Sequence, residues 1–120
     1  MGCVFGGYTA VPWTSGGGYK TDNTAFMFSL INPSNKPSRM KVKANGQNAV
    51  IHNSSYGPIF GDGHDLIIWG DSNSNKKSYV TPRSYEIPTE IHDPANGKFL
   101  HGDTTRNFQT VEVEVFQVVE

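Results

Sequence analysis

Residues 58–69 read PIFGDGHDLIIW, a glycine-rich turn with three ionisable side chains followed directly by an apolar strand. Gly61 and Gly63 permit backbone conformations with positive φ, so we expect both in a tight turn. Leu66 to Trp69 has no polar position, which is typical of a strand covered on both faces. Asp65 stands at the junction, where its carboxylate is expected to accept backbone N–H groups of the turn.

Hydrophobic residues elsewhere in the chain recur with a period of two and hardly anywhere with a period of 3.6, which predicts strands. One face of a strand is expected to carry Phe26, Phe28 and Leu30. The pair Asn45-Gly46 predicts a tight hairpin turn between two strands. The expected strands cover residues 4–9, 26–30, 40–44, 49–52, 66–69, 85–87 and 111–119.

The composition fits one small domain over residues 1–120. Thirteen glycines and seven prolines in 120 residues indicate many turns, and the segment 71–107 is mostly polar and punctuated by both. Together with the alternation, this predicts a mainly β protein: a two-layer antiparallel β-sandwich with long loops and little helix.

Charge and cysteine content limit the function classes. Ten basic and eleven acidic residues give no net field for nucleic acid, and no apolar run is long enough for membrane insertion. The single cysteine, Cys3, forms no internal disulfide, which favours a cytoplasmic protein. Secretion stays open, because Asn53-Ser54-Ser55 matches the N-glycosylation acceptor pattern.

Several motifs together resemble the TLDc domain family. They are Val4-Phe5-Gly6-Gly7-Tyr8-Thr9 with Pro12-Trp13, Asp22 before Ala25-Phe26-Met27-Phe28-Ser29-Leu30, the 58–69 stretch, and Val113-Glu114-Val115-Phe116. The residues that carry the resemblance as a structural motif are Phe5, Gly6, Gly7, Trp13, Phe26, Phe28, Gly61, Gly63 and Asp65. TLDc domains are two packed antiparallel sheets, in agreement with the predicted sandwich.

The resemblance also implies a missing neighbour for the first strand. TLDc domains usually have a helical segment and a strand ahead of the Phe-Gly-Gly-Tyr-like motif, which here begins soon after Met1. We therefore expect a domain truncated at its N-terminus. The strand Val4–Thr9 would then be an unpaired edge, and a homodimer through it is the expected repair.

The function implied by the resemblance is that of a non-catalytic protein-interaction module without a cofactor. TLDc domains are associated with protection against oxidative damage and with binding and regulation of the vacuolar proton-pumping ATPase. No residue of this chain is carried over as catalytic, because such a function belongs to a surface.

Two enzymatic alternatives rest on the residues themselves. A hydrolase or peroxide-handling enzyme could use His64 with a carboxylate such as Asp65, although neighbours on a strand point to opposite faces. Glu112 and Glu114 share one face of the last expected strand, as a pair of catalytic carboxylates would. Valines fill the other face of that strand, so solvated glutamates are the favoured interpretation.

Asp62, His64 and Asp65 offer oxygen and nitrogen ligands within one turn, but their spacing matches no established metal loop. No metal is therefore expected. A last alternative is an extracellular ligand-binding sandwich, which the acceptor pattern at Asn53 and the aromatic residues among the loops would suit.

Overall fold

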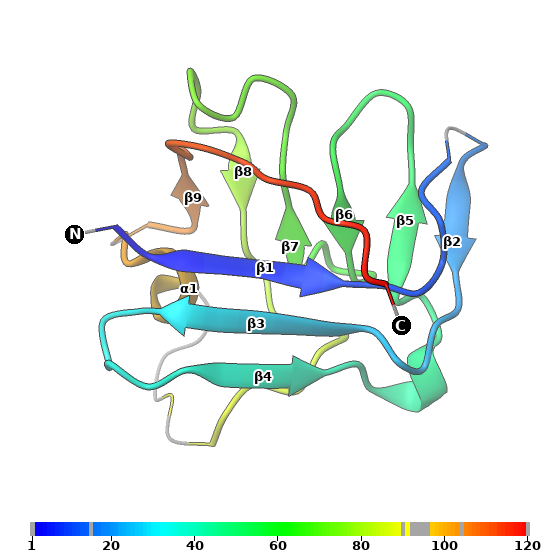
Figure 1. Cartoon of the computed structure of the whole chain (residues 1–120), viewed down its shortest axis with the longest axis horizontal. Coiled ribbons are helices and arrows are strands. Elements are labelled where there is room, and N and C mark those ends of the chain that lie inside the picture. Colours follow the sequence, from blue (N-terminus) through cyan, green and yellow to red (C-terminus); the bar gives the residue numbers. More distant parts are fainter. Residues whose placement is uncertain (1, 15, 90, 92–96, 104, 120) are drawn as a thin grey trace.

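The computed structural model describes residues 2–14, 16–89, 91, 97–103 and 105–119. Two antiparallel sheets pack face to face, and 28% of the described residues have strand conformation against 6% in helices, which confirms the predicted sandwich (Figure 1). One sheet has three strands in the order β1-β3-β4, and the other has six in the order β2-β5-β6-β7-β8-β9. The described residues contain no helix that is long and apolar enough to cross a membrane.

The three-stranded sheet consists of β1 (Val4–Tyr8), β3 (Phe26–Ile31) and β4 (Ser38–Lys41). The six-stranded sheet consists of β2 (Gly18–Lys20), β5 (Val50–His52), β6 (Ile59–Phe60), β7 (Leu66–Ile67), β8 (Ser78–Tyr79) and β9 (Asn107–Phe108). Two short helices, η1 (Ala44–Gly46) and α1 (Lys98–His101), lie in the connections.

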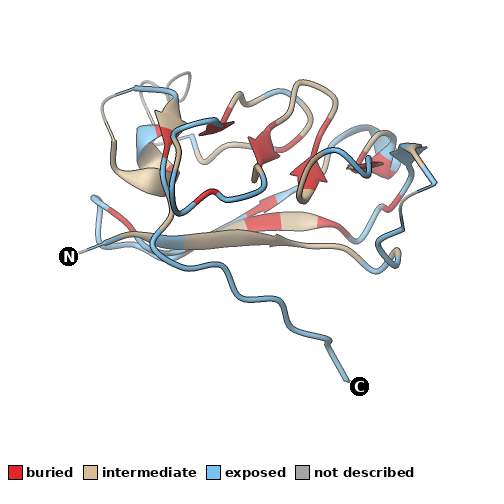
Figure 2. Ribbon diagram, turned by 90° about the horizontal axis from the view of Figure 1, so that it is seen from above, coloured by how far each residue is buried: buried red, intermediate tan, exposed pale blue. Residues whose placement is uncertain are grey.

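The hydrophobic core lies between the two sheets, where Figure 2 shows the buried residues facing one another. Met27 of β3 and Met40 of β4 are fully buried and enter the core from the three-stranded sheet. Leu66 and Ile67 of β7 are neighbours in sequence and both about 1% exposed, so the expected coverage of this strand on both faces is confirmed. The strand itself ends at Ile67, two residues earlier than expected.

Strand β3 shows which of two apolar sets faces the core. Met27 and Ser29 are buried, whereas Phe26 and Phe28 are half-buried and Leu30 is exposed. Phe26, Phe28 and Leu30 thus share one side of the strand, as expected, and that side is the outer one. Met27 and Ser29 face the core, while on the outer face the ring of Phe26 contacts the rings of Tyr8 and Phe28.

The expected hairpin at Asn45-Gly46 is wrong. Both residues lie in η1, with φ of 57° and 80°, and the preceding strand ends at Lys41. Strands β4 and β5 belong to different sheets, so this connection crosses between the layers. Gly46 O accepts the N–H of Asp22 at 2.9 Å, which ties the crossing to the start of β3 instead of closing a hairpin.

Two further expected strands are also wrong. Tyr85 forms only an isolated antiparallel bridge with Val42, so residues 85–87 are not a strand. Residues 111–119 form no strand, and every one of them is exposed. Apolar and polar residues alternate in this segment, but the apolar ones are not buried, because no strand of either sheet pairs with it. Four short strands of the six-stranded sheet, β2, β6, β8 and β9, had no counterpart among the expected ones.

Candidate functional site

The turn at residues 61–65 is built around the side chain of Asp65. Gly61 has φ of 88°, and a Cβ on it would overlap the Asp65 carboxylate, so glycine is required there for two reasons. The other positive φ in the turn, 57°, belongs to His64, and our expectation of positive φ at Gly63 is wrong. Gly63 is small for another reason, since a Cβ on it would lie 2.9 Å from the side chain of Arg83.

Asp65 is completely buried, and its side chain serves as a hydrogen-bond acceptor for backbone N–H groups. Its carboxylate accepts the N–H groups of Arg83 at 2.7 Å, Ser84 at 2.8 Å and Tyr85 at 2.9 Å. Burial raises the pKa of this carboxyl, and the hydrogen bonds from the three N–H groups oppose that rise. Backbone capping by Asp65 was expected, but these N–H groups belong to a distant segment and not to its own turn.

The three ionisable side chains of the turn diverge. Half-buried His64 places Nδ1 2.6 Å from the hydroxyl of Tyr79, and Asp62 forms an ion pair with Arg83 at 3.7 Å. The partner of His64 in this contact is therefore a phenol, and Asp65 is engaged elsewhere. Among the described residues, no three His, Cys, Asp or Glu side chains gather as a metal site would require.

Tyr79, the partner of His64, is itself in contact with Arg106, and sequence reasoning missed both residues. The Arg106 guanidinium lies 4.3 Å from the centre of the Tyr79 ring, a cation–π distance. Tyr79 lies on strand β8, which has only two residues and is therefore too short for an alternating sequence pattern to reveal it.

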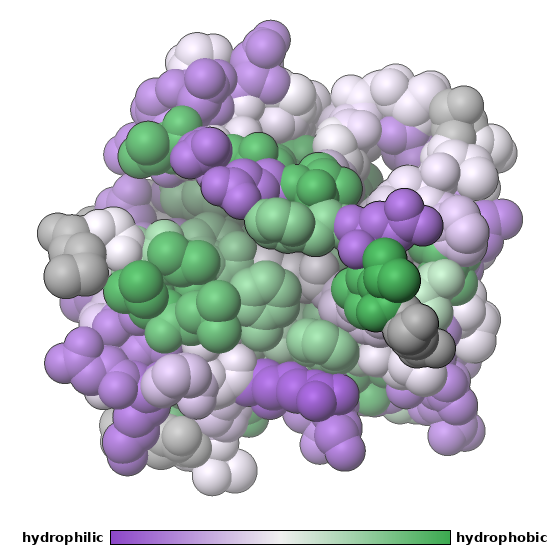
Figure 3. Space-filling view, in the orientation of Figure 1, coloured by the Kyte–Doolittle hydropathy of each residue, from purple (hydrophilic) through white to green (hydrophobic). Residues whose placement is uncertain are grey.

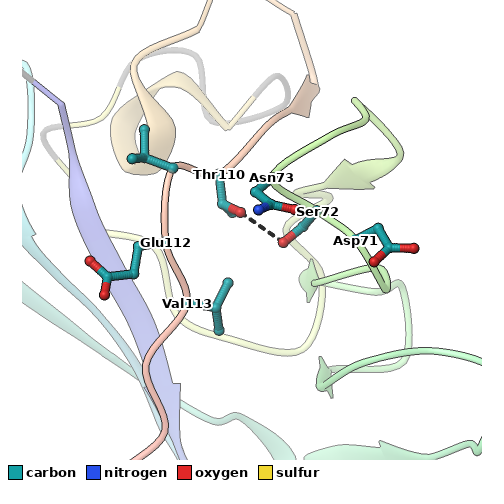
Figure 4. A pocket seen from close by; sticks show the side chains of 7 residues that line it. Asp71, Ser72, Asn73, Thr110, Glu112 and Val113 are labelled. Atoms are coloured by element: carbon teal, nitrogen blue, oxygen red, sulfur yellow. Dashed lines mark hydrogen bonds between the residues drawn. The ribbon is translucent and has the colours of Figure 1, made fainter.

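Glu112 and Glu114 lie in the exposed segment after β9 and not on a strand. A cavity of about 360 Å³ is lined by residues 71–73 and 110–113 (Figure 4). The hydroxyls of Ser72 and Thr110 in its lining are 2.7 Å apart, while the side chain of Glu112 points away from them. The outward orientation expected for the two glutamates agrees with their exposure. The expectation that the adjacent valines fill the core is wrong.

Trp13 lies beside a second cavity, of about 350 Å³, on the face of the six-stranded sheet near β5. The centre of its ring lies 5.3 Å from the ring centre of His52 and 5.6 Å from that of Phe60, yet 41% of the residue is exposed. Asn53, at the rim, is exposed, and its side-chain oxygen accepts the N–H of Ser55 at 2.8 Å. The glycosylation acceptor pattern therefore occupies an accessible turn.

The motif glycines of β1 face opposite sides of the three-stranded sheet. A Cβ on Gly7 would lie 2.6 Å from the ring of Phe60 in the core, and a Cβ on Gly6 would lie 2.8 Å from the ring of Phe28 on the other side. Phe5 packs edge-on against Phe108 at 5.3 Å. Glycine in these places lets aromatic rings lie directly against the β1 backbone.

Beyond Gly6 extends what we call the outer face, formed by Tyr8, Phe26, Phe28, Leu30 and Arg39. Tyr8 stacks on Phe26 at 5.2 Å, and the Arg39 guanidinium lies 4.2 Å from the centre of the Phe26 ring. Leu30 is 53% exposed, and Val4 and Ile31 at the end of the sheet are also exposed. Apolar residues gather over β1 and β3 in the space-filling view (Figure 3). Sequence reasoning missed this face because both sets of β3 residues are largely apolar.

Comparison with known families gives one result for the whole domain. The sequence model of the TLDc domain matches residues 1–119. Comparison with curated proteins and with solved structures gave no significant match. The matched range includes the β1 motif, the turn that Asp65 organises and the exposed terminal segment. The chain belongs to the TLDc domain family.

Proposed function

We propose that this TLDc domain is a non-catalytic protein-interaction module of the cytoplasm. We further propose that it takes part in oxidative-stress protection and binds and regulates the vacuolar proton-pumping ATPase, as the properties associated with TLDc domains imply. The observation that carries the proposal is the outer face, an apolar and aromatic surface on the three-stranded sheet.

The outer face has the composition of a protein-binding surface. Aromatic residues and arginine are enriched where proteins meet, and contiguous exposed apolar patches mark such sites. Phe26 is held between Tyr8 and Arg39, so these rings are already ordered before a partner arrives. A preordered surface loses less side-chain entropy on binding.

The charges on the same sheet indicate the kind of partner. Arg39 and Lys41 of β4 are both exposed, and the sequences of β1, β3 and β4 contain no aspartate or glutamate. A complementary partner therefore presents apolar side chains bordered by acidic ones.

Binding of the purified ATPase to the immobilised domain tests the proposal. Leu30→Glu places a charge on the most exposed apolar residue of the outer face, and we expect it to abolish binding and any effect on ATP-driven proton pumping. Ser54→Glu is the matched control, because it adds the same charge at an exposed position near β5. Equal binding by wild type and Leu30→Glu, with Ser54→Glu also unchanged, would refute a role for the outer face.

The enzymatic alternative has its own test. If the domain consumes hydroperoxides or hydrolyses model esters, and His64→Gln stops turnover while the thermal midpoint is retained, the enzyme hypothesis replaces the binding module. We expect no turnover that depends on His64, because its ring contacts Tyr79 and Asp65 is occupied by three backbone N–H groups.

A further inference from the structure

Strand β1 is an open edge of the three-stranded sheet. It pairs with β3 on one side, and no described strand pairs with it on the other. Its sequence, VFGGY, has neither a charged residue nor a proline, the residues that usually protect an edge from further pairing. The unpaired backbone groups of β1 are therefore free to accept another strand.

The same chain carries a segment with the pattern of a strand and no partner. Residues 111–118 read VEVEVFQV, with strict alternation over the first five positions. Val111 is 96% exposed, Val115 81% and Phe116 76%, far above what apolar side chains of a paired strand show. Just before the segment, Thr110 N–H donates to Ser72 O at 2.9 Å.

We propose that residues 111–119 of one copy add as an antiparallel strand to β1 of a second copy, and that the second copy does the same in return. The result is a two-fold dimer with exchanged strands. Each chain supplies one edge and one segment, so two identical contacts satisfy both copies and the assembly closes.

The direction of the segment explains why the strand comes from a second copy. In Figure 1 it runs the same way as β1, so pairing with its own β1 would be parallel. All strand pairs described here are antiparallel, the arrangement with the more stable hydrogen bonds. The segment also leaves its own domain on the outer side of the three-stranded sheet (Figure 2), and the cavity at residues 71–73 shows that its first residues do not pack closely.

Charge complementarity supports the same partner. The three strands of the accepting sheet carry Arg39 and Lys41 and no acidic residue, whereas residues 111–119 carry Glu112 and Glu114 and no basic one. With the valines directed toward the core, the glutamates of the added strand lie on the same side of the sheet as Arg39. The formal net charge of the chain is only −1, so two copies repel one another little.

Sedimentation velocity over a dilution series tests the exchange. We expect the full chain to sediment as a dimer and a chain that ends at Thr110 to sediment as a monomer with the same circular dichroism spectrum. The double variant Val113→Pro with Glu114→Pro should also be monomeric. Neighbouring N–H groups point to opposite sides of a strand, so one of the two prolines always removes a hydrogen bond of the pairing. Val113→Thr with Glu114→Thr is the control and should remain dimeric.

Amide exchange locates the contact. In the dimer, amides of Val4–Tyr8 and of residues 111–119 should exchange slowly, and those of Val4–Tyr8 should become faster in the chain that ends at Thr110. A monomeric full chain, or a dimer that survives the truncation, overturns the proposal. The ATPase-binding function can fail independently, because Leu30→Glu changes the outer face while the edge and the segment stay intact.

Discussion

The carboxylate of Asp65 accepts the backbone N–H of Tyr85 at 2.9 Å, twenty residues further along the chain. Tyr85 is itself fully buried, and its hydroxyl donates to the carbonyl of Ala49 at 2.6 Å. The pair therefore connects the start of β7, the long 71–107 region and the residue before β5.

Replacing Asp65 should strongly destabilise the domain. In Asp65→Asn the amide NH₂ faces N–H donors, and at least one buried donor loses its acceptor. We expect a loss of about 2–4 kcal/mol in the free energy of unfolding. Urea denaturation measures this loss. Asp62→Asn is the control, because its ion pair with Arg83 is partly exposed and should be worth less than about 1 kcal/mol. Similar losses in both variants would contradict the structural role of Asp65.

The two glycines of the turn should differ. Gly61→Ala combines positive φ with overlap of the Asp65 carboxylate and should cost about 2 kcal/mol or more. Gly63→Ala has no positive φ to strain it, but its Cβ would lie 2.9 Å from Cβ and Cδ of Arg83, so it should cost about 1 kcal/mol, less than Gly61→Ala. Thermal melts compare them with Gly70→Ala, where a Cβ meets nothing within 4 Å. Equal midpoints for Gly61→Ala and Gly70→Ala would refute this ranking.

The sandwich was predictable from sequence because alternation and turn residues report local preferences. Leu66 and Ile67 show this best, since an uninterrupted apolar run has only one stable environment in a sheet. Residues 111–119 show the opposite. Their alternation is as regular as any in the chain, but a strand also needs a neighbouring edge, and no local pattern specifies one.

The candidate site was predictable only in part. The need for glycine at position 61 and a capping role for Asp65 followed from the turn sequence. The partners of Asp65 at residues 83–85 did not, because their contact is set by tertiary packing across eighteen to twenty residues. The outer face was equally inaccessible, since Phe26 and Met27 are both apolar and sequence alone does not decide which faces the core.

Acid should destabilise the domain in two stages, the first through His52. This residue is 2% exposed, and its Nδ1 lies 3.1 Å from the hydroxyl of Thr14, while its Nε2 has no hydrogen-bond partner among the described residues. Burial, and then the charge of Lys20, lowers the pKa of His52 below the ordinary 6.5. The neutral ring is the form that the fold accepts, so stability should be complete above pH 6.5 and decline as the pH falls below it.

The second stage belongs to Asp22. Desolvation acts to raise the pKa of this carboxyl, but hydrogen bonds from Thr24, Thr9 and Ala10 outweigh it and hold the pKa below the ordinary 3.8. Its contribution to stability is present above pH 3.8 and is lost as the pH falls through the lowered pKa. Urea midpoints from pH 8 to pH 3 measure both stages. His52→Gln should remove the first stage only, and a first stage that persists in this variant would assign it to another group.

The charges of Lys41, Lys43, Glu112 and Glu114 should contribute little to the fold. All four residues are exposed, so none of the four charges is buried. Exposed charges contribute about 0–1 kcal/mol, so reversing all four together should shift the free energy of unfolding by no more than about 1 kcal/mol. Asp65→Asn, in the same urea assay, supplies the contrast of a buried charge.

The neutral double variant Glu112→Gln with Glu114→Gln separates folding from chemistry. It keeps the shape of both side chains and removes only their ionisation, so we expect unchanged unfolding midpoints and unchanged binding of the ATPase to the outer face. In the proposed dimer the two glutamates lie on the same side of the sheet as Arg39 and Lys41 but about 14 Å away, across β1 and β3. The variant should therefore dimerise slightly more weakly at low salt and equally well at high salt. Loss of a measurable enzymatic activity in a correctly folded double variant would instead show that the two carboxylates form an acid–base pair.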